Sequence, residues 1–368
     1  AWYLVLLAFA GRGELAPRLR AALTWVRARW ARWGARGLRA RAIGEDGGAP
    51  EPGRLAPGPW SQQPSPLTAL RARPASPRGG RRGRGLAGTA LALLAAAVLL
   101  SWTAAFHRPD GLLHLYLLDI GQGDALLLVS PNGRRLLIDG GPSPAALLAQ
   151  LGRLTAPWDR RLDLVLLSHP DADHVGGLPE ALRRYRVGAV VDPDLPAESP
   201  DAAAWAAALD ANPLPRHRAS AGGHIVLDRA AGVQLDLLWP PEPRLSGVES
   251  PTNENAVVLR LRYGSTRALF TGDIGAPAEA ALRAGGQDLR AEILKVAHHG
   301  SHGSSTEAFL AAVQPRAALI GVGKDNRYGH PAPQTLQRLD AAGVSRVWRT
   351  DHDGRVELVS DGRRWWQP

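Results

Sequence analysis

Residues 169–174 read His-Pro-Asp-Ala-Asp-His and follow directly on an apolar run, Leu162–Leu167. Four side chains of this stretch are able to bind a metal ion: His169, Asp171, Asp173 and His174. A strand that ends in imidazoles and carboxylates supplies the nitrogen and oxygen ligands of a hydrolytic metal site, in which one position stays open for water. A single histidine or aspartate would fit a polar turn, but four at this spacing indicate a metal site.

Two more strands end in residues of the same kind. Asp273 follows the apolar run 268–270, and His298 and His299 follow the run 293–297. In a layered α/β fold such strand ends meet at one edge. Two divalent ions about 3.5–4 Å apart need several His and Asp ligands and a bridging carboxylate. The three strand ends therefore predict one metal centre. The turns at 119–124 and 139–141 also carry aspartates, but ordinary turns explain them equally well.

Short apolar runs alternate with helical patterns from residue 112 onward, which predicts an α/β domain of two sheet layers flanked by helices. Strands are expected at 113–119, 125–130, 135–138, 163–167, 189–192, 234–239, 256–262, 267–271, 292–296, 317–320, 345–348 and 355–359. Helices are expected at 143–154, 177–185, 201–210, 276–284, 305–313 and 333–342.

Composition excludes some classes of site and divides the chain in two. The sequence has no Cys, which excludes disulfides, thiolate zinc sites and Cys nucleophiles, and no Met, which indicates a piece of a longer protein. Residues 1–110 carry 17 arginines against 5 acidic residues, whereas residues 111–368 carry 27 basic and 29 acidic residues. The high net charge therefore belongs to the N-terminal region and is no direct sign of nucleic-acid binding by the rest.

The N-terminal region reads as membrane-associated. Residues 86–106 contain no charge, and 21 such residues are long enough to cross a hydrocarbon core of roughly 30 Å. Residues 1–10 look like the end of an earlier transmembrane helix, and residues 11–85 form an Arg-, Pro- and Gly-rich loop with a disordered composition. Arginines before residue 86 place that loop in the cytoplasm and the domain at 112–360 outside it.

The order of motifs downstream is specific. It runs LDIGQGDA, LIDGG, LSHPDADHVGG, NENAVVLRL, LFTGD, LKVAHHGSHGSS and YGHP. This order resembles the metallo-β-lactamase superfamily and, more closely, the C-terminal domain of ComEC-type competence proteins, which are membrane channels for DNA uptake. The resemblance covers about residues 112–360, and it implies an αββα sandwich with a metal site at its edge. The channel core would lie upstream of this chain.

The resemblance also implies roles for residues. His169 and Asp171 would serve one metal position, Asp173 and His174 the other, with Asp273 bridging and His298 or His299 as a further ligand. Asp173, Asp273 and His299 would be the catalytic set. The superfamily pattern has His at position 171, and the Asp found here favours Mn²⁺ or Mg²⁺ more than an imidazole would, with Mn²⁺ expected first and Zn²⁺ or Mg²⁺ as the alternatives. A middle histidine of the superfamily has no clear equivalent beyond His217 and His224, so the domain would hold one or two ions.

Several further residues would line the site. Asn255 lies in the Asn-containing segment, and five others could bind phosphate oxygens or serve only as loop and turn hydrogen-bonding groups: Ser301, Ser304, Ser305, Tyr328 and His330. A local basic surface would have to come from Arg260, Arg262, Lys324 and Arg327.

Three functions fit these features. The first is a multi-pass inner-membrane protein whose extracytoplasmic, metal-dependent nuclease domain degrades the non-transported DNA strand beside other parts of the competence machinery. The second is a DNA-binding or structural domain with a degenerate site, which Asp171 and the missing histidine favour. The third is hydrolysis of another phosphodiester, such as a phosphocholine or teichoic acid ester.

Overall fold

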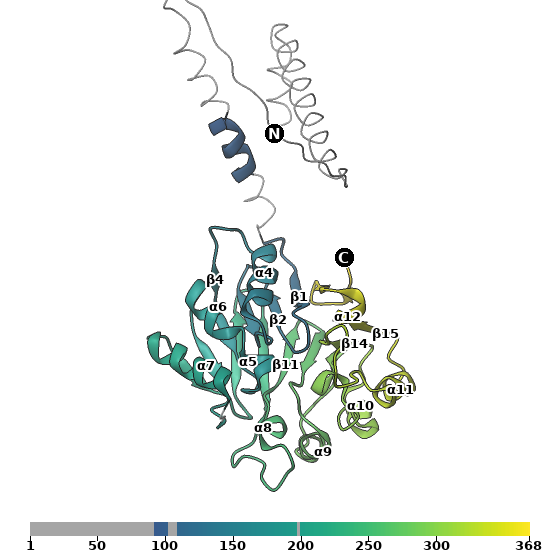
Figure 1. Ribbon diagram of the computed structural model, residues 1–368. Coiled ribbons are helices and arrows are strands. Elements are labelled where there is room, and N and C mark those ends of the chain that lie inside the picture. Colours follow the sequence, from purple (N-terminus) through teal and green to yellow (C-terminus); the bar gives the residue numbers. More distant parts are fainter. Residues whose placement is uncertain (1–91, 102–108, 197–198) are drawn as a thin grey trace, which may run out of the picture. The chain divides into compact units, whose positions relative to one another are not determined.

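The computed structural model describes residues 92–101, 109–196 and 199–368 (Figure 1). The chain divides into two units, residues 1–77 and 78–368, and every described residue belongs to the second. The expectations for residues 1–10 and 11–85 therefore lie outside the described residues. Within the segment 86–106, residues 92–101 are helical. Across the described ranges, none of the helices has the length and apolarity that a membrane crossing requires.

The first sheet has eight strands in the order β17-β16-β1-β2-β3-β5-β7-β8. Strands β16, β1, β2 and β3 pair antiparallel, whereas β3, β5, β7 and β8 pair parallel. The bounds are β1 Leu113–Leu117, β2 Leu126–Val129, β3 Arg135–Ile138, β5 Leu164–Leu166, β7 Val190–Asp192, β8 Arg216–Arg218, β16 Val356–Ser360 and β17 Trp365–Trp366. A separate parallel pair joins β4 (Arg161–Leu162) to β6 (Arg186–Val187).

The second sheet has seven strands in the order β15-β14-β13-β12-β11-β10-β9. Strands β9 to β12 pair antiparallel, and β12 to β15 pair parallel. The bounds are β9 His224–Asp228, β10 Val233–Trp239, β11 Val258–Tyr263, β12 Thr266–Phe270, β13 Ile293–Lys295, β14 Ala317–Ile320 and β15 Arg346–Arg349.

Helices connect the strands, and the longer ones cover the outer faces of the two sheets. They are α4 Pro144–Leu154, α5 Ala172–Val175, α6 Leu178–Arg184, α7 Pro200–Ala211, α8 Pro251–Glu254, α9 Ala276–Ala284, α10 Glu307–Val313, α11 Pro333–Ala341 and α12 Thr350–Asp353, with a 3₁₀ turn η1 at Ala297–Gly300. Capping residues mark the start of several helices. Ser143, for example, accepts a hydrogen bond from Ala146 N, and Pro144 takes the first helical position.

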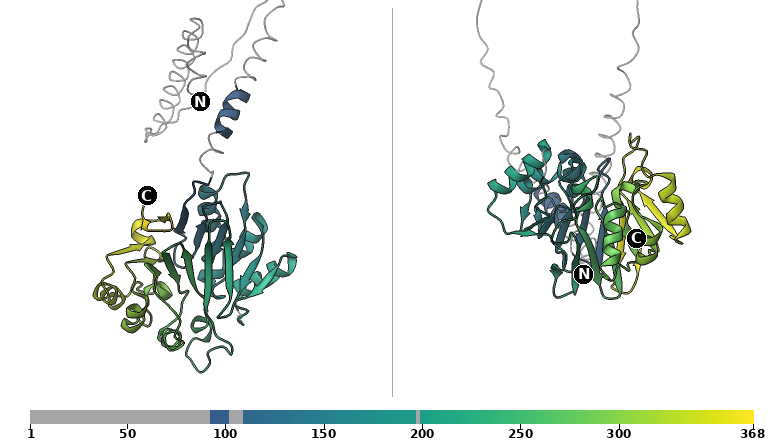
Figure 2. Two further views of the ribbon diagram at one scale, coloured as in Figure 1. Left: turned by 180° about the vertical axis from the view of Figure 1, so that it is seen from behind. Right: turned by 90° about the horizontal axis from the view of Figure 1, so that it is seen from below.

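The apolar residues form three layers because strand side chains alternate between faces. Leu128 on β2 and Leu261 on β11 belong to a cluster between the two sheets. Leu127 and Leu137 face the other way and pack with residues of α4, α6 and α7, such as Leu147. The second sheet packs in the same manner against α9, α10 and α11. Figures 1 and 2 show the resulting αββα arrangement, with teal helices on one side and yellow-green helices on the other.

The expected αββα domain is confirmed, and each of the strands and helices predicted above has a counterpart in the structure. The elements missed are short or polar: β4, β6, β8, β9, β17, α5, α8, η1 and α12. Strand β8 shows why. Its sequence is Arg-His-Arg and all of its side chains are exposed at the sheet edge, so no apolar run marks it.

Candidate metal centre

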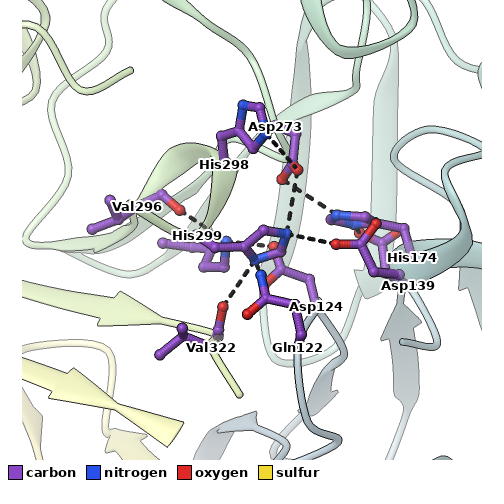
Figure 3. A network of polar contacts seen from close by, with 12 residues as sticks. Gln122, Asp124, Asp139, His174, Asp273, Val296, His298, His299 and Val322 are labelled. Carbon is purple, nitrogen blue, oxygen red and sulfur yellow. Dashed lines mark hydrogen bonds and ion pairs between the residues drawn. The ribbon is translucent and has the colours of Figure 1, made fainter. Parts of the chain in front are cut away.

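The site lies where the carboxyl ends of strands from both sheets meet. Strand β5 leads into residues 168–174, β12 into Thr271-Gly272-Asp273, and β13 into the η1 turn with His298 and His299. Because β12 and β13 run parallel, their polar ends fall at one edge. The predicted convergence of three strand ends on one place is therefore found (Figure 3).

Four side chains form a compact group, which we name the inner cluster: Asp173, His174, Asp273 and His299. One ligand atom of each lies within 4.8 Å of all the others. The Nε2 atom of His299 is 3.1 Å from Asp173 Oδ2 and 3.3 Å from Asp273 Oδ2. His174 Nε2 is 3.3 Å from Asp273 Oδ1. Asp273 thus faces both imidazoles, as a carboxylate central to the site must.

The ring orientation of each buried histidine is fixed by its other nitrogen. His174 Nδ1 lies 2.9 Å from Asp139 Oδ2, and His299 Nδ1 lies 2.8 Å from the carbonyl oxygen of Gly321. His169 Nδ1 lies 3.0 Å from the hydroxyl of Ser168, which donates to Asp139 in turn. When Nδ1 donates its proton to an acceptor, Nε2 of the neutral ring carries a free lone pair, as in metal-binding histidines.

The inward-facing atoms lie near carboxylates but make no hydrogen bond of adequate geometry. Among the described residues, the Nε2 atoms of His169, His174 and His299 are buried without one, and so is Oδ1 of Asp273. An unpaired buried polar atom costs roughly 1–3 kcal/mol, so native structures rarely keep one without reason. Four such atoms at one place fit a divalent metal ion that accepts their lone pairs.

Three more side chains lie near Asp273 at longer distances, and we name them the outer cluster: His169, Asp171 and His298. His169 Nε2 is 3.6 Å from Asp171 Oδ2 and 4.0 Å from Asp273 Oδ2. His298 Nε2 is 3.9 Å from Asp273 Oδ2. The side chains of Asp171 and His298 are 44% and 36% exposed, so this cluster is wider and wetter than the inner one.

The backbone at the histidine pair is unusual. His298 and His299 have φ values of 51° each, in the left-handed region that residues other than glycine rarely occupy. Such strain costs of order 1–3 kcal/mol per residue and gathers at functional sites. Two consecutive left-handed residues turn His299 inward while His298 stays at the rim, so the structure separates two side chains between which the sequence could not choose.

A buried ion pair lies beneath His299. Lys295 and Asp124 form a short contact, and both are 1% exposed. Asp124 Oδ1 also lies 3.4 Å from His299 Nδ1, and Lys295 Nζ donates to the carbonyl oxygen of Val296 at 2.8 Å. The neighbouring Gly123 lets the turn that carries Asp124 approach Asp173, because its φ is 128° and a Cβ there would overlap the carbonyl oxygen of Asp173.

Sequence reasoning missed most of this support. Local sequence pattern does not distinguish Asp124 and Asp139 from ordinary turn residues. One signal could have found Lys295, since it is one of two lysines in a chain whose other basic residues are arginine, and it ends an apolar strand.

The charges of the cluster shift the pKa values of its members. Burial opposes protonation of His174 and His299 and by itself would lower their pKa values. The carboxylate of Asp273 outweighs this effect and raises both pKa values well above the ordinary 6.5. Asp139 adds to the increase for His174, and Asp124 adds to it for His299. Burial would raise the pKa of Asp273, yet His299 and His174 hold it well below its usual range. Without a metal ion, protons on the histidines therefore balance the carboxylates.

The remaining predicted site residues differ in their surroundings. The Asn255 side chain is occupied by the backbone of Leu245 and Pro251, and the Ser304 hydroxyl donates to Ala297 O at 2.9 Å. The Ser304 contact favours the turn-bonding interpretation for that residue, and the Asn255 side chain bonds to backbone groups of its own segment. Ser301 accepts from Gly303 N at 3.4 Å.

Tyr328 and His330 lie beside the outer cluster. The His330 ring centroid is 5.8 Å from that of His298 and 6.0 Å from that of Tyr328. Burial, followed by the nearby His298 and His299, lowers the pKa of His330 to about 4.

Neither candidate for the middle histidine belongs to a close group of metal-capable side chains in the described residues. His217 on β8 is exposed, and His224 on β9 forms an ion pair with Asp236 at 3.0 Å. Among the described residues, the imidazoles that border Asp273 are therefore His169, His174, His298 and His299.

Comparison with known proteins agrees with this geometry. Residues 118–324 match the family described as the metallo-beta-lactamase superfamily. The chain belongs to the metallo-beta-lactamase superfamily, and it carries a metal-dependent hydrolase domain of that class.

Relatives narrow the class. The chain is 30% identical over 258 residues to ComE operon protein 3 of Bacillus subtilis, covering 66% of this chain and 32% of that protein. It is 32% identical over 279 residues to competence protein ComA of Neisseria gonorrhoeae, covering 75% of this chain and 36% of that protein. The expected likeness to ComEC-type competence proteins is confirmed, although the chain spans only about a third of these relatives' length.

A solved structure of similar fold is the metallo-beta-lactamase fold protein YhfI from Bacillus subtilis. It is 14% identical, covers 66% of this chain and 99% of its own, and gives a TM-score of 0.42.

Proposed function

We propose that the domain is a metal-dependent phosphodiesterase, a nuclease that degrades the non-transported strand of DNA during competence DNA uptake. The observation that carries the proposal is the set of buried, unpartnered Nε2 atoms of His169, His174 and His299 around Asp273. Likeness to competence proteins supports DNA as the substrate.

The residues take complementary roles. Asp173, His174, Asp273 and His299 would hold one divalent ion, and His169, Asp171 and Asp273 a second, with His298 at its edge. Bound ions would supply Lewis acidity, which activates water and neutralises charge on a phosphoryl oxygen. The chain's own contribution is orientation, because Asp139 and Gly321 hold the rings of His174 and His299 in place.

The ligand set favours Mn²⁺ over Zn²⁺ in the outer position. Asp171 supplies a carboxylate oxygen where the superfamily pattern has an imidazole, and harder oxygen ligands suit Mn²⁺ or Mg²⁺. The exposure of Asp171 leaves room for water among the ligands, which these ions retain more readily than Zn²⁺ does in closed sites.

Membrane anchoring is the second part of the proposal. Residues 86–106 would span the inner membrane, with the preceding arginines in the cytoplasm and the hydrolase domain outside. The described helical stretch 92–101 bears exposed apolar side chains, including Leu93, Leu94 and Val98. Fractionation of cells that express the chain, followed by protease treatment of spheroplasts, would test both claims. Digestion of the domain in intact spheroplasts is expected, and a fully protected domain would contradict the orientation.

A second candidate function is DNA binding by a domain with a degenerate site. The observation that favours it is the outer cluster, in which Asp171 replaces an imidazole and neither His217 nor His224 fills the missing position. This function predicts retention of DNA without cleavage in any divalent metal ion.

The test uses the whole chain with single- and double-stranded DNA in EDTA, Mg²⁺, Mn²⁺ or Zn²⁺. The variant Asp273→Ala removes the shared carboxylate, and Asp210→Ala is the matched control because its side chain is 79% exposed on α7. Metal-dependent cleavage that Asp273→Ala abolishes and Asp210→Ala keeps is expected. Full cleavage by Asp273→Ala would refute the assignment, and binding without cleavage by the wild type would favour the second function.

A further inference from the structure

A line of rings leads from the metal centre to the surface. The His298 and His330 ring centroids are 5.8 Å apart, and the His330 and Tyr328 centroids are 6.0 Å apart with the two rings inclined by 16°. Tyr328 is 61% exposed, so neither neighbour covers its ring. We name these three rings, with Arg327 beside them, the aromatic strip.

The loop that carries the strip is held in shape. The Asn326 side chain donates to the carbonyl oxygens of Gly323 and His330 and accepts from His330 N at 3.0 Å. Pro331 packs on Gly300, where a Cβ would meet it at 2.6 Å, and Ala332 N donates to Gly300 O. Tyr328 is therefore presented at a fixed place relative to the histidine turn, which a stacking surface needs and an arbitrary exposed side chain lacks.

The charge around the strip selects the kind of ring that would lie on it. Arg327 lies 5.9 Å from the Tyr328 centroid, and the loop 323–330 has two cations, Lys324 and Arg327, against one carboxylate, Asp325. A cation at this place attracts an anionic phosphate and repels a cationic group such as choline. Arg260 and Arg262, by contrast, form ion pairs with Asp236, and Arg260 also pairs with Asp288, so they add little to a basic surface.

We infer that the aromatic strip is a stacking site for a nucleobase of single-stranded nucleic acid whose phosphodiester lies at the metal centre. Exposed aromatic rings with nearby cations bind single strands because every base offers a planar face to stack. Tyr328 would take the base and Arg327 the adjacent phosphate, which assigns Tyr328 a role other than binding phosphate oxygens. The inference rests on the proposed nuclease function for its substrate class, but it makes its own prediction about binding.

The test measures binding and cleavage separately. Fluorescence anisotropy of the whole chain in EDTA compares an oligothymidylate with a strand of abasic sites of equal length. The wild type is expected to prefer the strand with bases, and Tyr328→Ala to lose about 5- to 150-fold in affinity for that strand alone. Tyr328→Phe keeps the ring and the preference. Trp158→Ala, which removes a 52% exposed ring from the segment after α4, changes neither affinity.

The outcomes separate the two proposals. The inference is overturned if the wild type binds both strands equally or not at all, or if Tyr328→Ala keeps the preference. If base preference depends on Tyr328 but no metal ion supports cleavage, the stacking site stands and the nuclease fails. If both strands are cleaved equally well by the wild type and by Tyr328→Ala, and the base preference is absent, the nuclease stands and the stacking site fails.

Discussion

The two halves of the metal centre share Asp273 but differ in how firmly they are built. In the inner cluster, Asp173, His174 and His299 close around Asp273, and both imidazoles are fixed by Nδ1 contacts. In the outer cluster, Asp171 and His298 are partly exposed, and the distances to His169 and Asp273 reach 3.6–4.0 Å. The fold therefore preorganises one candidate ion position, whereas a second ion would have to draw its ligands together on binding.

Removal of the inner histidine should have the largest effect. His299→Ala is expected to lower cleavage by more than about 100-fold, because it removes a ligand and loss of a mere supporting contact already costs about 10- to 100-fold. His298→Ala should cost less, since its ring lies at the rim. Cleavage rates and bound metal, measured by mass spectrometry, check this order.

His302→Ala is the control, because this exposed histidine lies three residues beyond His299 and is expected to change nothing. A larger loss in His298→Ala than in His299→Ala would reverse the assignment of the two clusters.

The ion pair under the inner cluster should matter for stability as well as for the site. Lys295→Met leaves the buried Asp124 carboxylate without its lysine partner, and we expect a loss of about 3–5 kcal/mol in the free energy of unfolding. Urea denaturation measures it. The double variant with Asp124→Leu should regain much of that stability and still bind metal about 10- to 100-fold more weakly, because Asp124 no longer faces His299 Nδ1. Metal affinity equal to wild type would exclude a positioning role for the pair.

The dependence of metal affinity and of stability on pH should arise mainly from the inner cluster. The pKa values of His174 and His299 are raised, so both imidazoles hold protons at pH values where an ordinary histidine has lost them. A metal ion must displace those protons, so apparent affinity should rise with pH until it passes the raised pKa values. The metal-free protein shows the opposite sign, since the stability from these protonated histidines is present at low pH and is lost as pH rises through the raised values.

Calorimetry of metal binding in two buffers of different ionisation enthalpy measures the proton release. The pH range from about 6 to about 9 begins near the ordinary pKa of histidine and extends above it. A metal affinity that does not change across this range, with no proton released on binding, would contradict the raised pKa values.

The smallest effect on activity should follow from a substitution in the outer cluster that restores the superfamily pattern. Asp171→His restores the superfamily pattern and replaces an oxygen ligand by an imidazole, so the preferred ion should move from Mn²⁺ toward Zn²⁺. The fold and the inner cluster should stay as they are, because Asp171 is a partly exposed rim residue. Activity profiles across the metal ions, compared with wild type, test the shift. An unchanged profile would mean that position 171 binds no metal.

Sequence and structure agree where local pattern determines the outcome. The apolar runs that end at His169, Asp273 and His298 indicated the strands and the candidate ligands that follow them, and β12 and β13 bring two of these ends to one edge because they run parallel. Such a pattern could not choose between His298 and His299, since that choice depends on two left-handed backbone conformations.

The supporting residues were harder to foresee. Asp124 and Lys295 are 171 positions apart in the sequence and meet only because β13 ends beside the β1–β2 turn. Edge strands such as β8 could not be predicted because their side chains are exposed and form no apolar pattern in the sequence. Long-range pairing and edge exposure are properties of the packed fold, so neither leaves a mark in a short window of sequence.

A calorimetric titration of Mn²⁺ into the metal-free chain and into Asp171→Ala tests the division of the site into the inner and outer clusters. We expect two phases in the wild type, a tight one from the inner cluster and a weak one from the outer cluster, with only the weak phase lost in Asp171→Ala. Loss of the tight phase in Asp171→Ala, with the weak phase kept, would contradict the division of the site into a preorganised and an assembled half.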